Sequence, residues 1–308
     1  MYFKPIAYIV SLFLFCSCFT GVEHTGRITA KDVAKVKADM KTEEELFFDT
    51  VFPEDFLKWK PGKKFFVVDN NVRLIFNPSA DYDVSTLELK GDTLEYTGYK
   101  FIRQIDNSED LVVSFSDGKN VYQYNTGKTI EEIQTVRPEY VAPFLIDLDY
   151  VARVNGLLAS RQLYIKTSLW YDSDRLLKGG LKYVPVEIVS VEPGDVVYPF
   201  FVRFRCEGKD AGVFMSSSSA SVKNMTFDKL FSFTDIRKSY KTITDVNWER
   251  IINGQIAVGM TKDECSLSLG NPSSIERMPT HGGMYERWSY DNGVYVIFED
   301  GLLVQFRQ

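Results

Sequence analysis

An internal repeat of short strand-like segments constrains this chain more than any other feature of its sequence. From Lys63 onward, runs with apolar residues at alternating positions are separated by turn signals, and Asp117-Gly118 between two such runs is typical of a β-hairpin. The same order of segments then returns: 62–76 matches 160–172, 89–105 matches 177–191, and 112–124 matches 201–215. We therefore expect two β modules of one design, the second with a shorter first loop.

The composition favours folded domains and excludes a nucleic-acid binder. The chain has 308 residues, of which 44% are hydrophobic and 14% aromatic, and this length suggests two or three domains. Its net charge is −6, and no long block of like charge forms a basic stripe. We expect no nucleic-acid partner.

Helical material is expected before each β module. A helix capped by Thr29 can extend to Val51, and residues 147–154 can form a second, shorter helix. We therefore place the first helix-plus-β module at 29–135 and the second at 136–240.

The last segment, residues 241–308, has a different pattern. Thr261 and Glu264 form a capping box at the start of a short helix, and Gly270 ends it. An amphipathic helix precedes it and ends near Gly254. The runs "YERWSY" and "VYVIFEDGLLVQFRQ" then predict a three-strand meander.

The N-terminus has the pattern of a secretory signal. A basic residue precedes an apolar run from Ile6 to Phe15, which is too short to span a bilayer comfortably. Ser17 before Cys18 resembles a bacterial lipobox. The resemblance implies that residues 1–17 are removed, that Cys18 is acylated and that residues 18–28 form a tether; several acyl chains make such an anchor in effect permanent. An ordinary secretory signal is the alternative.

The two repeats resemble bacterial SH3-like barrels. Each has five or so short strands, as a small half-open barrel needs, and paired "LKG" and "DGK/EGK" turns. Another small β-sandwich or barrel stays open as an alternative.

The C-terminal segment resembles the SmpA/OmlA family of BamE-like lipoproteins. The residues that carry the resemblance are Ile256, Val258 to Thr261, Leu269 to Pro272, Trp288 with Tyr290, and the closing "VIFEDGLLVQF". It implies a two-helix, three-strand α+β domain used for protein contacts without catalysis. The expected fold class is therefore mainly β with α+β: two helix-plus-small-β-barrel (SH3-like) repeats, then the BamE-like domain.

The two cysteines beyond the tether, Cys206 and Cys265, are interpreted as buried core residues. Cys265 lies one turn before a helix end, and Cys206 shares one face of a strand with other apolar residues. A Cys206 to Cys265 disulfide is one alternative, and a cysteine hydrolase using Cys265 and His281 is another. His24 lies in the tether and cannot serve as the base.

Other chemical motifs are weak. Two cysteines and two histidines without close spacing do not make a metal site, and no phosphate-binding loop is present, so we expect no cofactor. The acids of "DLDY" (147–150) and "YDSDR" (171–175) are interpreted as helix caps and loop charges.

Together these features predict a lipoprotein of the bacterial cell envelope and not an enzyme. We expect it to be held at the outer membrane by the lipid on Cys18, facing the periplasm, and to act as a scaffold that contacts other envelope proteins. A peptidoglycan-binding lipoprotein that uses its SH3-like modules is the second candidate.

Overall fold

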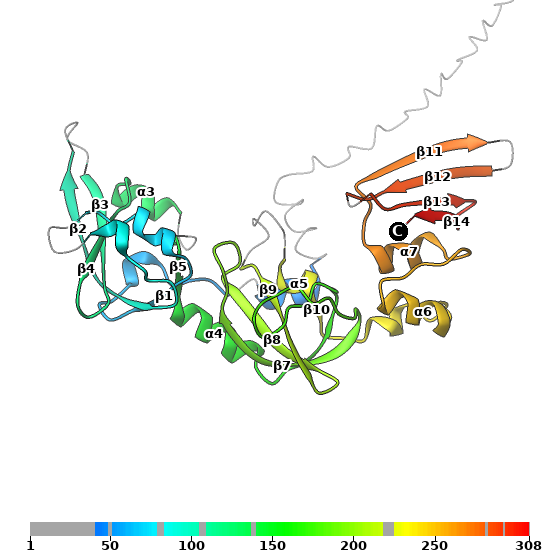
Figure 1. The fold of residues 1–308 in the computed structure, drawn as a ribbon, viewed down its shortest axis with the longest axis horizontal. Helices are drawn as coiled ribbons and strands as arrows, with labels where there is room; N and C mark the ends of the chain where they lie inside the picture. The colour runs from blue at the N-terminus through cyan, green and yellow to red at the C-terminus, as the bar shows by residue number, and fades with distance from the viewer. Residues whose placement is uncertain are drawn as a thin grey trace, which may run out of the picture. The chain divides into compact units, whose positions relative to one another are not determined.

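The computed structural model shows a mainly β protein with three antiparallel sheets and few short helices (Figure 1). No barrel is closed among the strands that the structure describes. The chain divides into two compact units, Met1–Lys41 and Thr42–Gln308, and nearly all described residues belong to the second. The described residues are 41–48, 51–78, 83–104, 109–136, 140–217, 225–280, 283–291 and 293–307.

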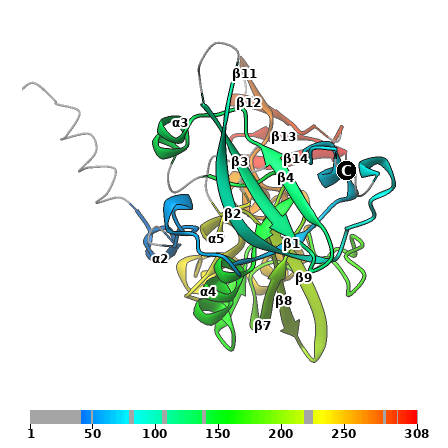
Figure 2. The same cartoon turned by 90° about the vertical axis from the view of Figure 1, so that its left-hand side faces the viewer.

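The first sheet has five strands in the order β4-β3-β2-β1-β5. Strands β2, β3 and β4 run side by side in Figure 2, and a register shift between Tyr96 and Gly98 marks a bulge in β2. The fifth strand pairs with β1, so this sheet extends past residue 135, where we expected its module to end. Its strands are β1 (Lys64–Val67), β2 (Thr93–Arg103), β3 (Glu109–Ser116), β4 (Val121–Asn125) and β5 (Leu145–Asp147).

The second sheet repeats this arrangement. Its order, β9-β8-β7-β6-β10, is that of the first sheet, and its bulge lies at the matching place, between Ile188 and Ser190. The shared strand order agrees with the repeat expected from the sequence. Its strands are β6 (Gln162–Ile165), β7 (Val184–Pro193), β8 (Phe200–Cys206), β9 (Lys209–Met215) and β10 (Phe231–Ser232).

Two smaller features also recur in both sheets. A residue between the first and second strands bridges to the fourth strand, as Phe76 does to Tyr124 and Tyr171 to Gly212. A short helix precedes the fifth strand in each case. These helices are α3 (Ile130–Thr135) and α5 (Phe227–Leu230).

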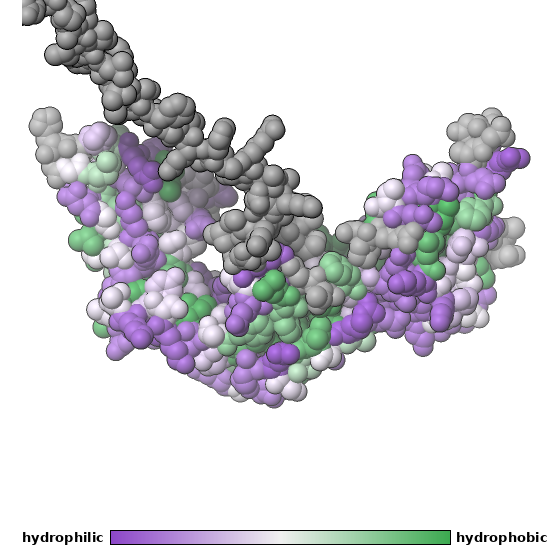
Figure 3. Space-filling view, turned by 180° about the vertical axis from the view of Figure 1, so that it is seen from behind, coloured by the Kyte–Doolittle hydropathy of each residue, from purple (hydrophilic) through white to green (hydrophobic). Residues whose placement is uncertain are grey.

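Each sheet buries its own core, and aromatic residues fill much of it. Phe65 and Phe115 in the first sheet and Phe200 and Phe204 in the second have at most 2% of their surface exposed. Burial of one such side chain contributes about 2 kcal/mol. On the face shown in Figure 3, hydrophilic residues cover much of the described surface and hydrophobic ones gather near the middle of the view.

Two helices precede the strands of the modules, as expected, and both pack on the second module. Helix α4 (Leu148–Leu158) begins at its N-cap Asp147, as predicted, and packs against β7. Helix α2 (Glu43–Phe48) covers only part of the helix predicted from Thr29, whose first residues lie outside the described part. It packs on α5 of the second module, where the ring of Phe48 stacks on Phe227 at 5.6 Å.

The third sheet has four strands, where the sequence predicted three. The extra strand is β11, which we missed because its residues show no regular alternation and include Pro279. The predicted capping box of Thr261 and Glu264 is confirmed, and Gly270 ends the helix at a positive φ of 86°. The elements are α6 (Asp245–Ile252), α7 (Lys262–Leu269), β11 (Ser274–Thr280), β12 (Gly283–Ser289), β13 (Tyr295–Glu299) and β14 (Leu302–Arg307).

Four 3₁₀ turns complete the described elements, and the first of them shapes the site below. They are η1 (Phe56–Lys58), η2 (Asn70–Leu74), η3 (Val84–Thr86) and η4 (Ile236–Ser239).

Candidate binding pocket

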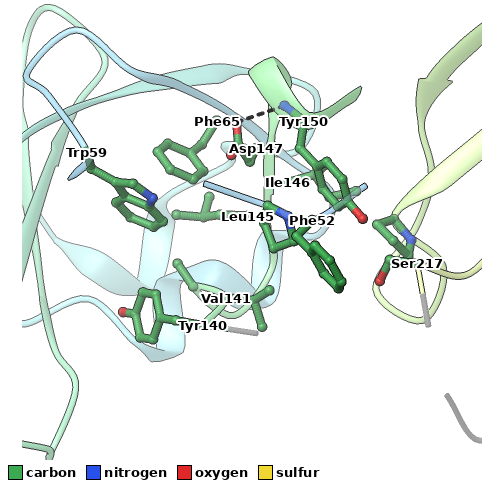
Figure 4. Close-up of a pocket in the computed structure, with 13 residues that line it drawn as sticks. Phe52, Trp59, Phe65, Tyr140, Val141, Leu145, Ile146, Asp147, Tyr150 and Ser217 are labelled. Carbon is green, nitrogen blue, oxygen red and sulfur yellow. Dashed lines mark hydrogen bonds between the residues drawn. The ribbon is translucent and has the colours of Figure 1, made fainter. Parts of the chain in front are cut away.

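A pocket of about 320 Å³ lies beside the last strand of the first sheet (Figure 4). Its lining is mostly apolar. Phe52 and Val141 are 53% and 67% exposed, respectively, and form part of its rim. The aromatic residues in the lining are Phe52, Trp59, Phe65, Tyr140 and Tyr150.

The short turn η1 positions the indole of Trp59. Asp55 caps this turn by accepting a hydrogen bond from the amide of Leu57, and the indole N–H of Trp59 donates to the carbonyl of Glu54 at 3.0 Å. The ring of Trp59 contacts those of Phe65, at 4.8 Å, and Tyr140, at 5.7 Å. These contacts leave the ring little rotational freedom, so this wall of the pocket is preformed.

Asp147 places a carboxylate in this apolar lining. Its side chain is only 9% exposed. One oxygen, Oδ1, accepts the amides of Asp149, at 2.9 Å, and Tyr150, the dashed line in Figure 4, and lies 3.0 Å from the ammonium of Lys63. The other oxygen, Oδ2, is buried and has no hydrogen-bond partner in the described structure. Oδ1 therefore has three donors around it, whereas Oδ2 has none among the described residues.

Lys63 gathers three carboxylates around one buried ammonium. Its Nζ lies 2.9 Å from Asp149, 3.0 Å from Asp147 and 3.2 Å from Glu54, and its side chain is 3% exposed. Burial alone would lower the pKa of Lys63, but the hydrogen bonds and charges of Asp149 and Asp147 outweigh it and raise that pKa. Lys63 therefore stays charged, and the cluster carries an excess of negative charge.

The two tyrosines of the lining are neutral near pH 7. Burial raises the pKa of Tyr150 to about 12, and its hydroxyl donates to the carbonyl of Val51 at 3.0 Å. Burial, with a smaller effect of Tyr124 and Tyr96, also raises the pKa of Tyr140. The Tyr140 hydroxyl is buried without a partner among the described atoms. It lies on the side of its ring away from Val141 in Figure 4.

The residues of the pocket do not form a nucleophilic centre of the kind that we considered from the sequence. Neither cysteine lines the pocket: Cys265 is fully buried in α7 and Cys206 lies in β8, and both are free thiols. Burial, with a smaller effect of Glu264, raises the pKa of Cys265 to about 12, so the thiolate is scarce. His281, the base of the hydrolase alternative, lies outside the described residues, as does His24.

Within the described ranges, no cluster of three or more His, Cys, Asp or Glu side chains is arranged to hold a metal ion. The carboxylates nearest to such an arrangement surround the ammonium of Lys63. What the pocket offers is a set of apolar walls and two lining residues, Asp147 and Tyr140, that each have a buried oxygen without a partner in the described structure.

The chain matches no protein-family model, no curated protein and no solved structure. Its function is therefore argued from its own residues.

The predicted lipidation site, Cys18, lies outside the residues that the structure describes, and so do the signal at 1–17 and the tether at 18–28. In the described part of the chain, none of the helices has both the length and the apolar character needed to span a bilayer. The proposal of a membrane anchor therefore depends on the sequence pattern around Cys18.

Sequence reasoning identified Asp147 as a helix cap but missed its place in the pocket. The signal that was available is the pair of acids in "DLDY" directly after the apolar run "FLI" (144–146). Lys63, their partner, is far away in the sequence, and only the pairing of β1 with β5 brings the two together.

Proposed function

We propose that this protein is a lipoprotein of the bacterial cell envelope that acts, without catalysis, as a binding and scaffolding module at the membrane surface. Its anchor is the lipid on Cys18, in the outer membrane and facing the periplasm. The observation that carries the proposal is the pair of five-stranded sheets of one strand order. The first of them adjoins a pocket whose described lining residues include neither cysteine nor histidine.

The strand arrangement supports the finer fold assignment. In both sheets the first strand lies between the fifth and the second, with the third and fourth beyond, and a short helix precedes the fifth strand. This order supports two half-open SH3-like modules. In the third domain, two helices and the capping box at Thr261 support a SmpA/OmlA-like assignment, with β11 as an addition to the expected three strands.

Acylation of Cys18 tests the anchor directly. Cells that express the full chain are grown with a palmitate analogue, and the protein is assayed for label. We expect label in the unaltered protein and in Cys16→Ser, and none in Cys18→Ser. A mature product that is freely soluble and unlabelled would contradict the proposal.

Cross-linking in intact cells tests the scaffolding role. We expect defined envelope proteins to be captured by the unaltered chain and lost with Cys18→Ser, because the soluble form is no longer held beside the membrane. Capture that is independent of Cys18 would separate partner binding from anchoring.

The aromatic pocket favours a second candidate, a peptidoglycan-binding lipoprotein. In this case the full chain would sediment with purified peptidoglycan, and Phe52→Ala at the rim of the pocket would reduce the bound fraction. Sedimentation that is unaffected by Phe52→Ala would argue against a role of the pocket in binding the wall.

A further inference from the structure

We propose that the pocket binds a primary ammonium group carried on an aliphatic stem, as in the side chain of lysine within a peptide. This inference deepens the proposed function and rests on it in one respect, that the pocket serves binding. It assigns to the pocket a ligand class and to Asp147 the role of a ligand-binding residue.

The local charge balance favours a cation. Lys63 contributes one positive charge, and Glu54, Asp147 and Asp149 within 3.2 Å of its ammonium contribute three negative ones. Arg153, which donates to the carbonyl of Phe52, and Lys58 and Lys60, beside the cluster, offset these charges. Among the described residues that line the pocket itself, however, Asp147 is the only one with a charged side chain. An anionic ligand would be repelled from this lining, and a cation would be attracted.

The unpaired oxygen of Asp147 gives the cation its position. A buried acceptor without a partner costs free energy, and a donor that enters the pocket removes that cost. A purely apolar ligand would leave Oδ2 unsatisfied. The ligand group therefore carries N–H donors as well as a positive charge.

The geometry of Asp147 favours an ammonium over a guanidinium. Arginine binds a carboxylate most strongly through two parallel hydrogen bonds, one to each oxygen. Here Oδ1 already accepts two backbone amides and lies beside Lys63, so only Oδ2 is free. A compact ammonium needs only that one oxygen.

The walls suit the rest of such a ligand. The faces of aromatic rings attract a nearby cation, and Trp does so most strongly. The aliphatic and aromatic lining would bury the methylene groups of the stem. A pocket of about 320 Å³ is at the small end of the range for ligand sites, which agrees with one side chain and not a large cofactor.

Calorimetric titration of the full chain in detergent tests the proposal with Nα-acetyl-lysine-N-methylamide as the probe. The matched compounds are its norleucine, Nε-acetyl-lysine and arginine counterparts. We expect the lysine compound to bind and each of the other three to bind at least about tenfold more weakly. Equal binding of the norleucine compound, or tighter binding of the arginine compound, would overturn the proposal.

Two variants with matched controls locate the binding. Asp147→Asn removes the free carboxylate, and Asp149→Asn removes an equal charge from the same cluster at a residue that does not line the pocket. Phe52→Ala opens the exposed rim, and Leu74→Ala truncates a comparably exposed side chain elsewhere. We expect Asp147→Asn and Phe52→Ala to weaken binding at least tenfold, and both controls to weaken it less than threefold.

Circular dichroism and thermal unfolding show whether each variant folds. If Asp147→Asn is unfolded, Phe52→Ala decides, because its side chain is half-exposed. Unchanged binding by a folded Asp147→Asn or by Phe52→Ala refutes the assignment. If the lysine compound fails to bind while Cys18 is acylated and partners are captured, the ligand class is wrong and the proposed function stands.

Discussion

The hydroxyl of Tyr183 donates a hydrogen bond to the backbone carbonyl of Leu267 at 3.1 Å. Leu267 lies in the last turn of α7, whose carbonyls have no partner within the helix. The ammonium of the neighbouring Lys182 donates to the carbonyl of Ser268, where a cation is favoured by the helix dipole. The segment before β7 thus satisfies the end of a helix that belongs to the third sheet.

Tyr183→Phe is expected to lower the free energy of unfolding by about 1 kcal/mol, because the carbonyl of Leu267 loses its shorter hydrogen bond and keeps only the longer one from Lys182, at 3.4 Å. Tyr183→Leu should cost more, since the ring also packs on Trp248 at a centroid distance of 5.7 Å. Urea unfolding of both variants measures the difference. Equal stability of Tyr183→Phe and the unaltered protein would mean that this hydrogen bond contributes nothing.

The third domain should lose stability in acid through Glu286. Its side chain is 3% exposed; burial alone would raise its pKa, but hydrogen bonds from Lys262, Trp288 and Arg277 outweigh this and lower the pKa to about 2. This pKa in the folded state lies below the ordinary glutamate pKa of 4.5, so the folded state binds fewer protons than the unfolded state. The stabilisation is fully present above about pH 4.5. It is lost as the pH falls toward 2, which urea unfolding at stepped pH values measures.

Glu286→Gln should destabilise the protein by about 1–3 kcal/mol near neutral pH, because it leaves Lys262 and Arg277 without their shared carboxylate. The matched control is Glu276→Gln on the neighbouring strand, whose side chain is exposed and whose loss should change stability by less than about 0.5 kcal/mol. Similar losses for both variants would show that the burial of Glu286 is unimportant.

Two glycines should respond to alanine in opposite directions. A Cβ at Gly212 in β9 would overlap the ring of Phe201, so Gly212→Ala is expected to cost about 1–3 kcal/mol. A Cβ at Gly156 in α4 meets nothing within 4 Å, so Gly156→Ala should stabilise the protein by about 0.5–1 kcal/mol. Thermal unfolding compares the two, and a stabilising Gly212→Ala would contradict the close packing of this ring.

The buried cysteines should resist alkylation. Native protein treated with iodoacetamide at pH 8 is expected to label Cys265 more slowly than Cys206, because Cys265 is fully buried and Cys206 is 6% exposed. Unfolding in urea should expose both thiols to similar labelling. Peptide mass spectrometry measures each site, and fast labelling of native Cys265 would restore the hydrolase alternative.

Local signals in the sequence predicted the long hairpins and the helix starts, which depend on residues close together in the chain. Alternation and turn residues, such as Asp117-Gly118, located the long hairpins, and caps such as Thr261 located helix starts. The fifth strand of each sheet was missed, because β5 and β10 have only three and two residues, respectively, and gain their identity from pairing with a distant strand. The packing of α2 on the second module was missed for the same reason.

The pocket could not be predicted from the sequence, because it too depends on contacts between residues far apart in the chain. The sequence shows Asp147 as an acid before a helix, and the structure confirms that cap. The ammonium of Lys63 beside one of its oxygens, and the lack of any partner at the other, depend on the pairing of strands far apart in the chain.

The docking of α2 bears on how a tethered body would respond to force. If Cys18 holds the protein to a membrane, tension along the N-terminal segment reaches α2 before any strand of the first sheet. This helix has only six residues, and its Phe47 and Phe48 rest on Phe227 at centroid distances of 5.2 and 5.6 Å. Under load it would peel away first, and the force would then pass to Phe52 and Pro53, which line the pocket, so that tension on the anchor would act on the pocket.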